Sequence, residues 1–321
     1  SLSDEQIDTI VAWVEAGAPE GEPVADSKAL GTPEQRTLSR VDEVLEMEAP
    51  YTPLNTPDEY RCFVLDWPYE EDIYVTGFSL NPDNTNVVHH GIAFVLDSEL
   101  AAEAVALDEA DEGQGYECFG GPGVANAQDV TWLGAWAPGG AAGDMPPGTG
   151  IGVAADSKIV LQVHFNMERD GPAPAQVQME VMVEESVENP ARIQPWADPT
   201  WLLGESMPIP PNTDNVVHDF SYTLSSFEFD IHYSALHMHK RGVSARFWKT
   251  DTDGNETCLL EIPRWDFDWQ RSYVFDEAMI VNSGDEWTLE CHWDNPTDAD
   301  VAWGDGTGDE MCLGTTLMSY R

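Results

Sequence analysis

The chain has 321 residues, enough for two domains that each bury a core of their own. Its 59 acidic and 14 basic residues give a net charge of −45, which excludes nucleic acid as a partner and favours a soluble monomer. No apolar run approaches the roughly 20 residues that span a bilayer, so we expect no membrane segment. The pattern of a signal peptide is also missing.

The first segment with a clear pattern is a short amphipathic helix over residues 3–16. Ser3 is a good N-cap, and Gln6 completes a capping box. The string LSDEQIDTIVAWVEAGAP resembles the last helix of bacterial cytochrome c domains, which would make residues 1–20 the remnant of a haem domain. The alternative is an unrelated N-terminal helix. Residues 21–50, rich in Pro, Glu and Ala, are expected to be a linker.

Beyond the linker the sequence has the texture of β-structure. Short apolar runs, some with period-two alternation, are separated by clusters of Gly, Pro, Asn and Asp. We therefore predict an all-β protein of two antiparallel, jelly-roll-like sandwiches, over 51–190 and 191–321, with a Pro-rich junction at 186–212. The predicted strands are 73–80, 87–97, 158–167, 176–185, 219–233, 243–250, 257–262 and 286–293.

A first group of candidate metal ligands consists of His89, His90 and His164. Adjacent residues on a regular strand point to opposite faces, so His89 and His90 can share an ion only at a strand end or a bulge, or if their nearer ring nitrogens curl toward the backbone; on geometry alone this counts against a shared site. A lone histidine in an apolar strand, such as His164, is commonly a hydrogen-bonded core residue. Three imidazoles would suit copper, or equally a catalytic zinc ion.

A second group lies in ALHMH at 235–239. His237 and His239 are two residues apart, so on a strand both side chains leave the same face and can chelate one ion. Met311, in DEMC at 309–312, would add a thioether, a soft ligand that suits Cu(I) and is a poor choice for Zn²⁺. The two groups together favour copper.

The five cysteines include no CxxC or CxxCH pair, which argues against a zinc ribbon or a covalently attached haem. Their number predicts disulfides and an oxidising compartment, so we expect a periplasmic or secreted protein. Cys62 and Cys118 lie on either side of the first histidine pair, Cys291 and Cys312 enclose the approach to Met311, and Cys258 is left over.

Residues 50–321 contain, in order, VVHHGIAF at 87–94, WAPGG and MPPGTG between 136 and 150, LQVHF at 161–165, HMHKRG at 237–242, WDFDWQ at 265–270 and DEMC at 309–312. Together these strings resemble the copper type II, ascorbate-dependent monooxygenases, the family of peptidylglycine α-hydroxylating monooxygenase and dopamine β-monooxygenase.

The resemblance implies a site for each of two coppers, separated by a solvent-filled cleft between the two sandwiches. His89, His90 and His164 would hold the electron-supplying copper, and His237, His239 and Met311 the copper that binds O₂. It also implies the disulfides Cys62–Cys118 and Cys291–Cys312, a supporting role for Gln162 near the first copper, and a role for Glu310, the acid that precedes the methionine ligand.

The implied reaction inserts one oxygen atom of O₂ into a substrate C–H bond, with ascorbate or a fused or separate c-type cytochrome as electron donor. In the peptide-amidating branch an arginine anchors the substrate carboxylate where this chain has Ala235, and an Asn and a Tyr stand where it has Leu313 and Thr315. We therefore expect a neutral or cationic small molecule as substrate. The alternatives are a catalytically silent copper-binding or electron-relay module, and a zinc hydrolase that uses the first group.

Overall fold

The computed structural model describes residues 3–19, 37–125, 130–138, 140, 142–168, 171–202, 207–225 and 227–321. The chain forms two compact units, Ser1–Gln35 and Arg36–Arg321. In the first unit the predicted helix is present as α1 (Asp4–Glu15), and its capping box is confirmed by reciprocal hydrogen bonds between Ser3 and Gln6. That this helix ends a haem domain stays a prediction. Much of the predicted linker lies outside the described residues.

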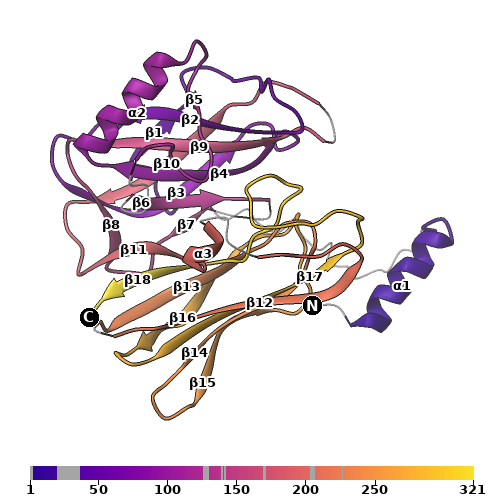
Figure 1. Ribbon diagram of the computed structural model, residues 1–321. Helices are drawn as coiled ribbons and strands as arrows, with labels where there is room; N and C mark the ends of the chain where they lie inside the picture. Colours follow the sequence, from indigo (N-terminus) through magenta and orange to yellow (C-terminus); the bar gives the residue numbers. More distant parts are fainter. Residues whose placement is uncertain are drawn as a thin grey trace, which may run out of the picture. The chain divides into compact units, whose positions relative to one another are not determined.

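The second unit is built almost entirely of strands (Figure 1), which confirms the all-β prediction. Its first half contains β1 (Glu43–Glu46), β2 (Asp58–Asp66), β3 (Ile73–Pro82), β4 (Val88–Leu96), α2 (Ser98–Ala110), β5 (Tyr116–Glu117), β6 (Thr131–Trp136), β7 (Gly143–Asp144), β8 (Thr149–Val153), β9 (Lys158–Asn166) and β10 (Val177–Glu184). Its second half contains β11 (Asn189–Trp196), α3 (Pro199–Leu202), β12 (Thr213–Thr223), β13 (Phe229–His237), β14 (Gly242–Thr250), β15 (Glu256–Ile262), β16 (Ser272–Val281), β17 (Glu286–Asn295) and β18 (Leu313–Tyr320).

One sheet runs through both halves. Its main path has the order β1-β10-β3-β8-β11-β6-β4-β9-β2-β5, and β11 also pairs with β18, which continues to β13 and β16. A separate four-stranded sheet has the order β12-β17-β14-β15. Because β11 pairs with both β8 and β18, the predicted junction at 186–212 contains a strand that joins the two halves.

Strand β9 shows how the fold positions the first histidine group. Its inner residues are buried on both faces, so apolar side chains lie on both sides of the strand. One face, with Leu161 and Phe165, belongs to the main core of the first half. On the other face Val160 packs in a smaller core together with α2. His164 alternates with these apolar neighbours and lies on the face of Val160.

In the second half, the four-stranded sheet packs on the other sheet through a core rich in tryptophan. Trp287 and Trp293 of β17 are almost completely buried there.

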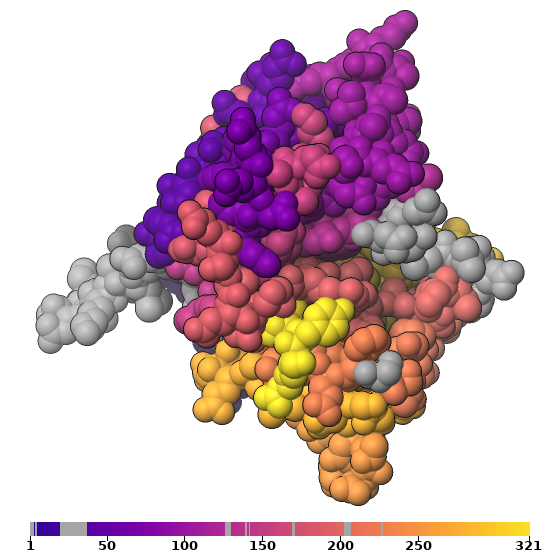
Figure 2. Space-filling view, turned by 90° about the vertical axis from the view of Figure 1, so that its left-hand side faces the viewer, coloured from indigo at the N-terminus to yellow at the C-terminus, as the bar shows by residue number. Residues whose placement is uncertain are grey.

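On the face shown in Figure 2, the end of the chain (yellow) reaches the surface, where Tyr320 is 52% exposed.

Seven of the eight predicted strands correspond to single strands. The run predicted at 219–233 is wrong as one strand, because the chain passes there from β12 in the four-stranded sheet to β13 in the other sheet. Helix α2 was not expected from the sequence. Among the described residues no helix is long and apolar enough to cross a membrane.

Candidate metal centre

The first histidine group lies on two neighbouring antiparallel strands. His90 of β4 stands opposite His164 of β9, and the register shifts between Val88 and His90. This irregularity is the bulge that two adjacent histidines need in order to face one ion. One potential ligand atom from each of His89, His90 and His164 lies within 4.8 Å of the others.

Hydrogen bonds fix the tautomer of His164. Its Nε2 lies 2.9 Å from Oδ1 of Asp58, a carboxylate that can only accept, so Nε2 carries the proton. Nδ1 lies 3.4 Å from Nδ1 of His90 and 3.1 Å from the hydroxyl of Tyr60. That hydroxyl donates its one proton to the carbonyl oxygen of Asp305. The lone pair on Nδ1 of His164 is therefore free for a metal.

Burial keeps the three imidazoles neutral. Together with the neighbouring His164, it lowers the pKa of His89 to about 3. Burial likewise holds the pKa of His90 well below its usual value, and it lowers the pKa of His164 against the opposing effect of Asp58. Nε2 of His89 is buried without a hydrogen-bond partner among the described residues. Neutral, convergent imidazoles and an orphaned nitrogen fit a metal ion.

The second histidine group lies at the end of β13. His237 is the last residue of β13 and His239 lies just beyond it, and their ring centroids are 5.0 Å apart, close enough to face one ion. Nδ1 of His237 donates to Oε1 of Gln270 at 2.6 Å, since the amide of Gln270 is oriented by its own bond to the carbonyl of Phe267. Nδ1 of His239 donates to the carbonyl of Asp309 at 3.1 Å. Both rings therefore leave Nε2 free, the opposite nitrogen to that of His164.

Glu310 organises the backbone of this second group. Its buried carboxylate accepts the backbone N–H of His239 at 2.9 Å, the backbone N–H of Arg241 at 2.5 Å and the indole N–H of Trp293 at 2.9 Å. Burial raises the pKa of Glu310 to about 7 against these donors. Met311, which is partly buried, follows directly in the chain. Glu310 thus ties the segment of Met311 to that of His239.

Both implied disulfides are present, as Cys62–Cys118 and Cys291–Cys312, and Cys258 is a free, exposed cysteine. The amide of Gln162 donates to the carbonyl of Gly121 at 2.6 Å and lies 3.7 Å from the sulfur of Cys118. Gln162 therefore supports the loop of the first disulfide.

The two histidine groups adjoin each other. The ring centroids of His90 and His237 are 6.1 Å apart, and Phe267 stacks on His89 at 4.4 Å. The groups are thus closer in this structure than the cleft-separated sites that the resemblance implies.

Sequence reasoning missed the side chains that orient the imidazoles. Asp58 and Tyr60 come from β2, where Tyr60 stands opposite His164 in register, and Gln270 and Asp309 come from loops. Alternation along β2 places Asp58, Tyr60 and Cys62 on one face. That pattern was the available signal.

A family model, "Copper type II ascorbate-dependent monooxygenase, C-terminal domain", matches residues 200–320. Among solved structures, the chain is similar to a peptide-N(4)-(N-acetyl-β-D-glucosaminyl)asparagine amidase, with 7% identity, TM-score 0.34, and 87% of this chain and 96% of that one covered. It is also similar to PNGase F, a glycosylasparaginase from Flavobacterium meningosepticum, with 8% identity, a TM-score of 0.35, and 87% of this chain and 96% of that one covered. The match to the VP2 subviral particle of infectious bursal disease virus has 11% identity and a TM-score of 0.22, and it covers 98% of this chain and 77% of that one. Scores this low carry no functional argument.

The matched segment contains His237, His239, Glu310 and Met311, the residues around the second histidine group. The donor set and the family agree on copper, and they support a copper monooxygenase-like role. Residues 200–320 thus match the C-terminal domain of the copper type II ascorbate-dependent monooxygenases, which supports the resemblance found in the sequence.

Proposed function

We propose that this protein is a monooxygenase with two copper sites that hydroxylates a C–H bond of a small molecule. The observation that carries the proposal is the pair of adjoining imidazole groups, in which His164, His237 and His239 each donate one ring N–H to a protein acceptor and so leave the other nitrogen for a metal. Copper bound there would supply the electrons and the O₂-binding centre for inserting one oxygen atom. The proposed ligands are His89, His90 and His164 for the first site, and His237, His239 and Met311 for the second.

The two sites have different donor sets and hence different tasks. A thioether such as that of Met311 is a soft, weak ligand that favours Cu(I), which suits the site that meets O₂. The all-imidazole site would supply the second electron, and the short distance between His90 and His237 supports that role. Asp58, Gln270 and Asp309 hold the ring protons away from the metal, and Glu310 holds the loop of Met311.

The substrate we propose is a neutral or cationic small molecule. Strand pairing places Ala235 opposite Thr315 and His237 opposite Leu313. The three departures from the peptide-amidating branch are therefore clustered beside the second site. An alanine cannot anchor a carboxylate, and a net charge of −45 attracts cations and repels anions.

The reductant and the location follow from the same proposal. The electron donor would be ascorbate or a c-type cytochrome, either fused to this chain or separate. Two disulfides and the family support a periplasmic or secreted protein. We propose a monomer, with O₂, the donor and the substrate as its partners.

The experiment compares copper-loaded wild-type protein with the His239→Ala variant in an oxygen electrode with ascorbate. Two aromatic probes that share a benzylic C–H, an amine and a carboxylate, are analysed for hydroxylated product. We expect O₂ uptake and hydroxylation of the amine by wild type only. Redox cycling without product would indicate the electron-relay alternative, and ester hydrolysis by the zinc-loaded protein would indicate the hydrolase.

A further inference from the structure

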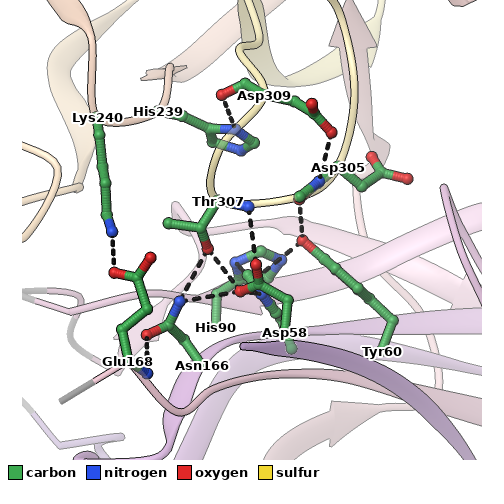
Figure 3. A network of polar contacts seen from close by, with 12 residues as sticks. Asp58, Tyr60, His90, Asn166, Glu168, His239, Lys240, Asp305, Thr307 and Asp309 are labelled. Atoms are coloured by element: carbon green, nitrogen blue, oxygen red, sulfur yellow. Dashed lines mark hydrogen bonds and ion pairs between the residues drawn. The ribbon is translucent and has the colours of Figure 1, made fainter. Parts of the chain in front are cut away.

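Asp58, at the start of β2, receives hydrogen bonds from both halves of the large unit (Figure 3). Its Oδ1 accepts from Nε2 of His164 at 2.9 Å, from Nδ2 of Asn166 at 2.9 Å and from the hydroxyl of Thr307 at 2.7 Å. Its Oδ2 accepts the backbone N–H of Thr307 at 3.2 Å. A single carboxylate thus joins β9 of the first half to a loop of the second.

The first of these contacts acts on the first histidine group. Because Asp58 binds the proton on Nε2, the ring of His164 presents Nδ1 toward His90. A carboxylate behind a ligating imidazole also raises the basicity of the ligand nitrogen. The side chain of His164 is 1% exposed, so solvent cannot replace this acceptor.

The contacts to Thr307 act on the second histidine group. The loop from Gly304 to Asp309 is closed at its ends by Gly304 N–H bonding to the carbonyl of Glu310, and by Asp309 N–H bonding to that of Gly306. The carbonyl of Asp309 in turn accepts Nδ1–H of His239. The loop that Asp58 holds is therefore the loop that orients His239.

Two other contacts fasten the same junction. The hydroxyl of Tyr60, which stacks on His164 at 4.1 Å, donates to the carbonyl of Asp305 in this loop. Lys240, next to His239, forms an ion pair with Glu168 of the first half. Asp58 differs from Lys240 because it bonds directly to a candidate ligand of one site and to the supporting loop of the other, and from Tyr60 because it accepts the ring proton of that ligand.

We propose that Asp58 is a positioning residue that couples the two metal sites: it sets the ring of His164 for metal binding and holds the 304–309 loop that orients His239. The inference rests on the proposed function of the two histidine groups. It adds that occupation of the first site tightens the loop of the second through Asp58 and Thr307.

The first test measures the affinity of the first site for Cu(I) by chelator competition, in chains that carry His237→Ala and His239→Ala so that only this site is titrated. Asp58→Asn is expected to weaken binding by about 10- to 100-fold, the usual cost of losing a supporting carboxylate. It is also expected to change the EPR spectrum of the Cu(II) form. Asp66→Asn is the matched control, because Asp66 lies on the same strand in an exposed ion pair with Lys158.

The second test follows hydrogen exchange of the 304–309 segment in the chain with its native second-site ligands, without metal and with one equivalent of copper. Copper is expected to slow exchange about fivefold or more in wild type, the size of an ordinary coupling between sites. We expect Asp58→Asn to abolish this slowing. Thr307→Val is expected to raise exchange while it leaves the first-site EPR spectrum unchanged, and it serves if Asp58→Asn does not fold.

The coupling is overturned, and the proposed function left intact, if Asp58→Asn has the Cu(I) affinity, the EPR spectrum and the hydrogen exchange of the 304–309 segment that wild type has. The same holds if Thr307→Val exchanges like wild type. Absence of copper binding at the first site in chains that retain Asp58 would overturn the proposed function together with this inference.

Discussion

Replacing Glu310 is expected to lower the stability of the protein, because its side chain is the acceptor for several buried N–H groups. It is fully buried, and its carboxylate accepts three N–H groups, from His239, Arg241 and Trp293. Glu310→Ala would leave all three donors buried without an acceptor. An orphaned buried donor costs about 1–3 kcal/mol, so we expect the free energy of unfolding to fall by at least about 3 kcal/mol.

Glu310→Gln is the second variant, and it keeps the size and shape of the side chain. At pH 5, below the pKa of about 7, the carboxyl of Glu310 is protonated in the folded chain and offers the same single carbonyl-type acceptor as Gln, so we expect only a small part of that loss. The assay is urea unfolding of metal-free, disulfide-intact protein. It is run at pH 5, where Glu310 carries no charge in the folded chain, so that the comparison measures its hydrogen bonds and not the cost of burying a charge.

Glu256→Gln is the control, because the Glu256 side chain is 52% exposed and forms a surface ion pair with Arg246. Such a change is expected to stay within about 0.5 kcal/mol. If Glu310→Ala loses no more stability than this control, the three hydrogen bonds do not hold the loop, and the reasoning is refuted.

Three further predictions concern the same half of the chain. Met311→Ala is expected to abolish ascorbate-dependent O₂ activation while first-site copper, measured by EPR, is retained; full activity would remove Met311 from the mechanism. Replacing both Cys291 and Cys312 with Ala, which opens a cross-link between residues 21 apart, is expected to cost about 3 kcal/mol in urea unfolding; an unchanged midpoint would contradict this. Burial and the neighbouring Asp309 raise the pKa of Asp305 from 3.8 to about 6, so its stabilising contribution, complete below pH 4, is lost as the pH rises through 6. In metal-free protein the free energy of unfolding of Asp305→Asn, relative to that of wild type, should therefore rise by up to about 2 kcal/mol between pH 4 and 7. If the two free energies of unfolding change with pH in parallel, the pKa of Asp305 is not raised.

Local patterns predicted the parts of the site that depend on local geometry. The spacing of His237 and His239 predicted that their rings lie close together, as they do. The adjacency of His89 and His90 left a strand end, a bulge or curled ring nitrogens open, and the structure has a register shift at this point. Helix α2 escaped prediction because it buries only two alanines and has no broad apolar stripe.

The other parts of the site depend on contacts between residues that are far apart in the sequence. Asp58 is 106 residues from His164, and Gln270 is 33 from His237, so no local period connects them. The proximity of His90 to His237 depends on how β11 and β18 join the two halves. Sequence motifs identify ligand types, but strand register and loop packing determine which nitrogen each ligand offers.

The most direct test of the two-site account is the copper stoichiometry of protein reconstituted under reducing conditions and analysed after desalting. The account predicts two coppers per chain in wild type, one in His164→Ala and one in His237→Ala. A single copper in wild type that is lost in both variants would show one shared site and contradict the account.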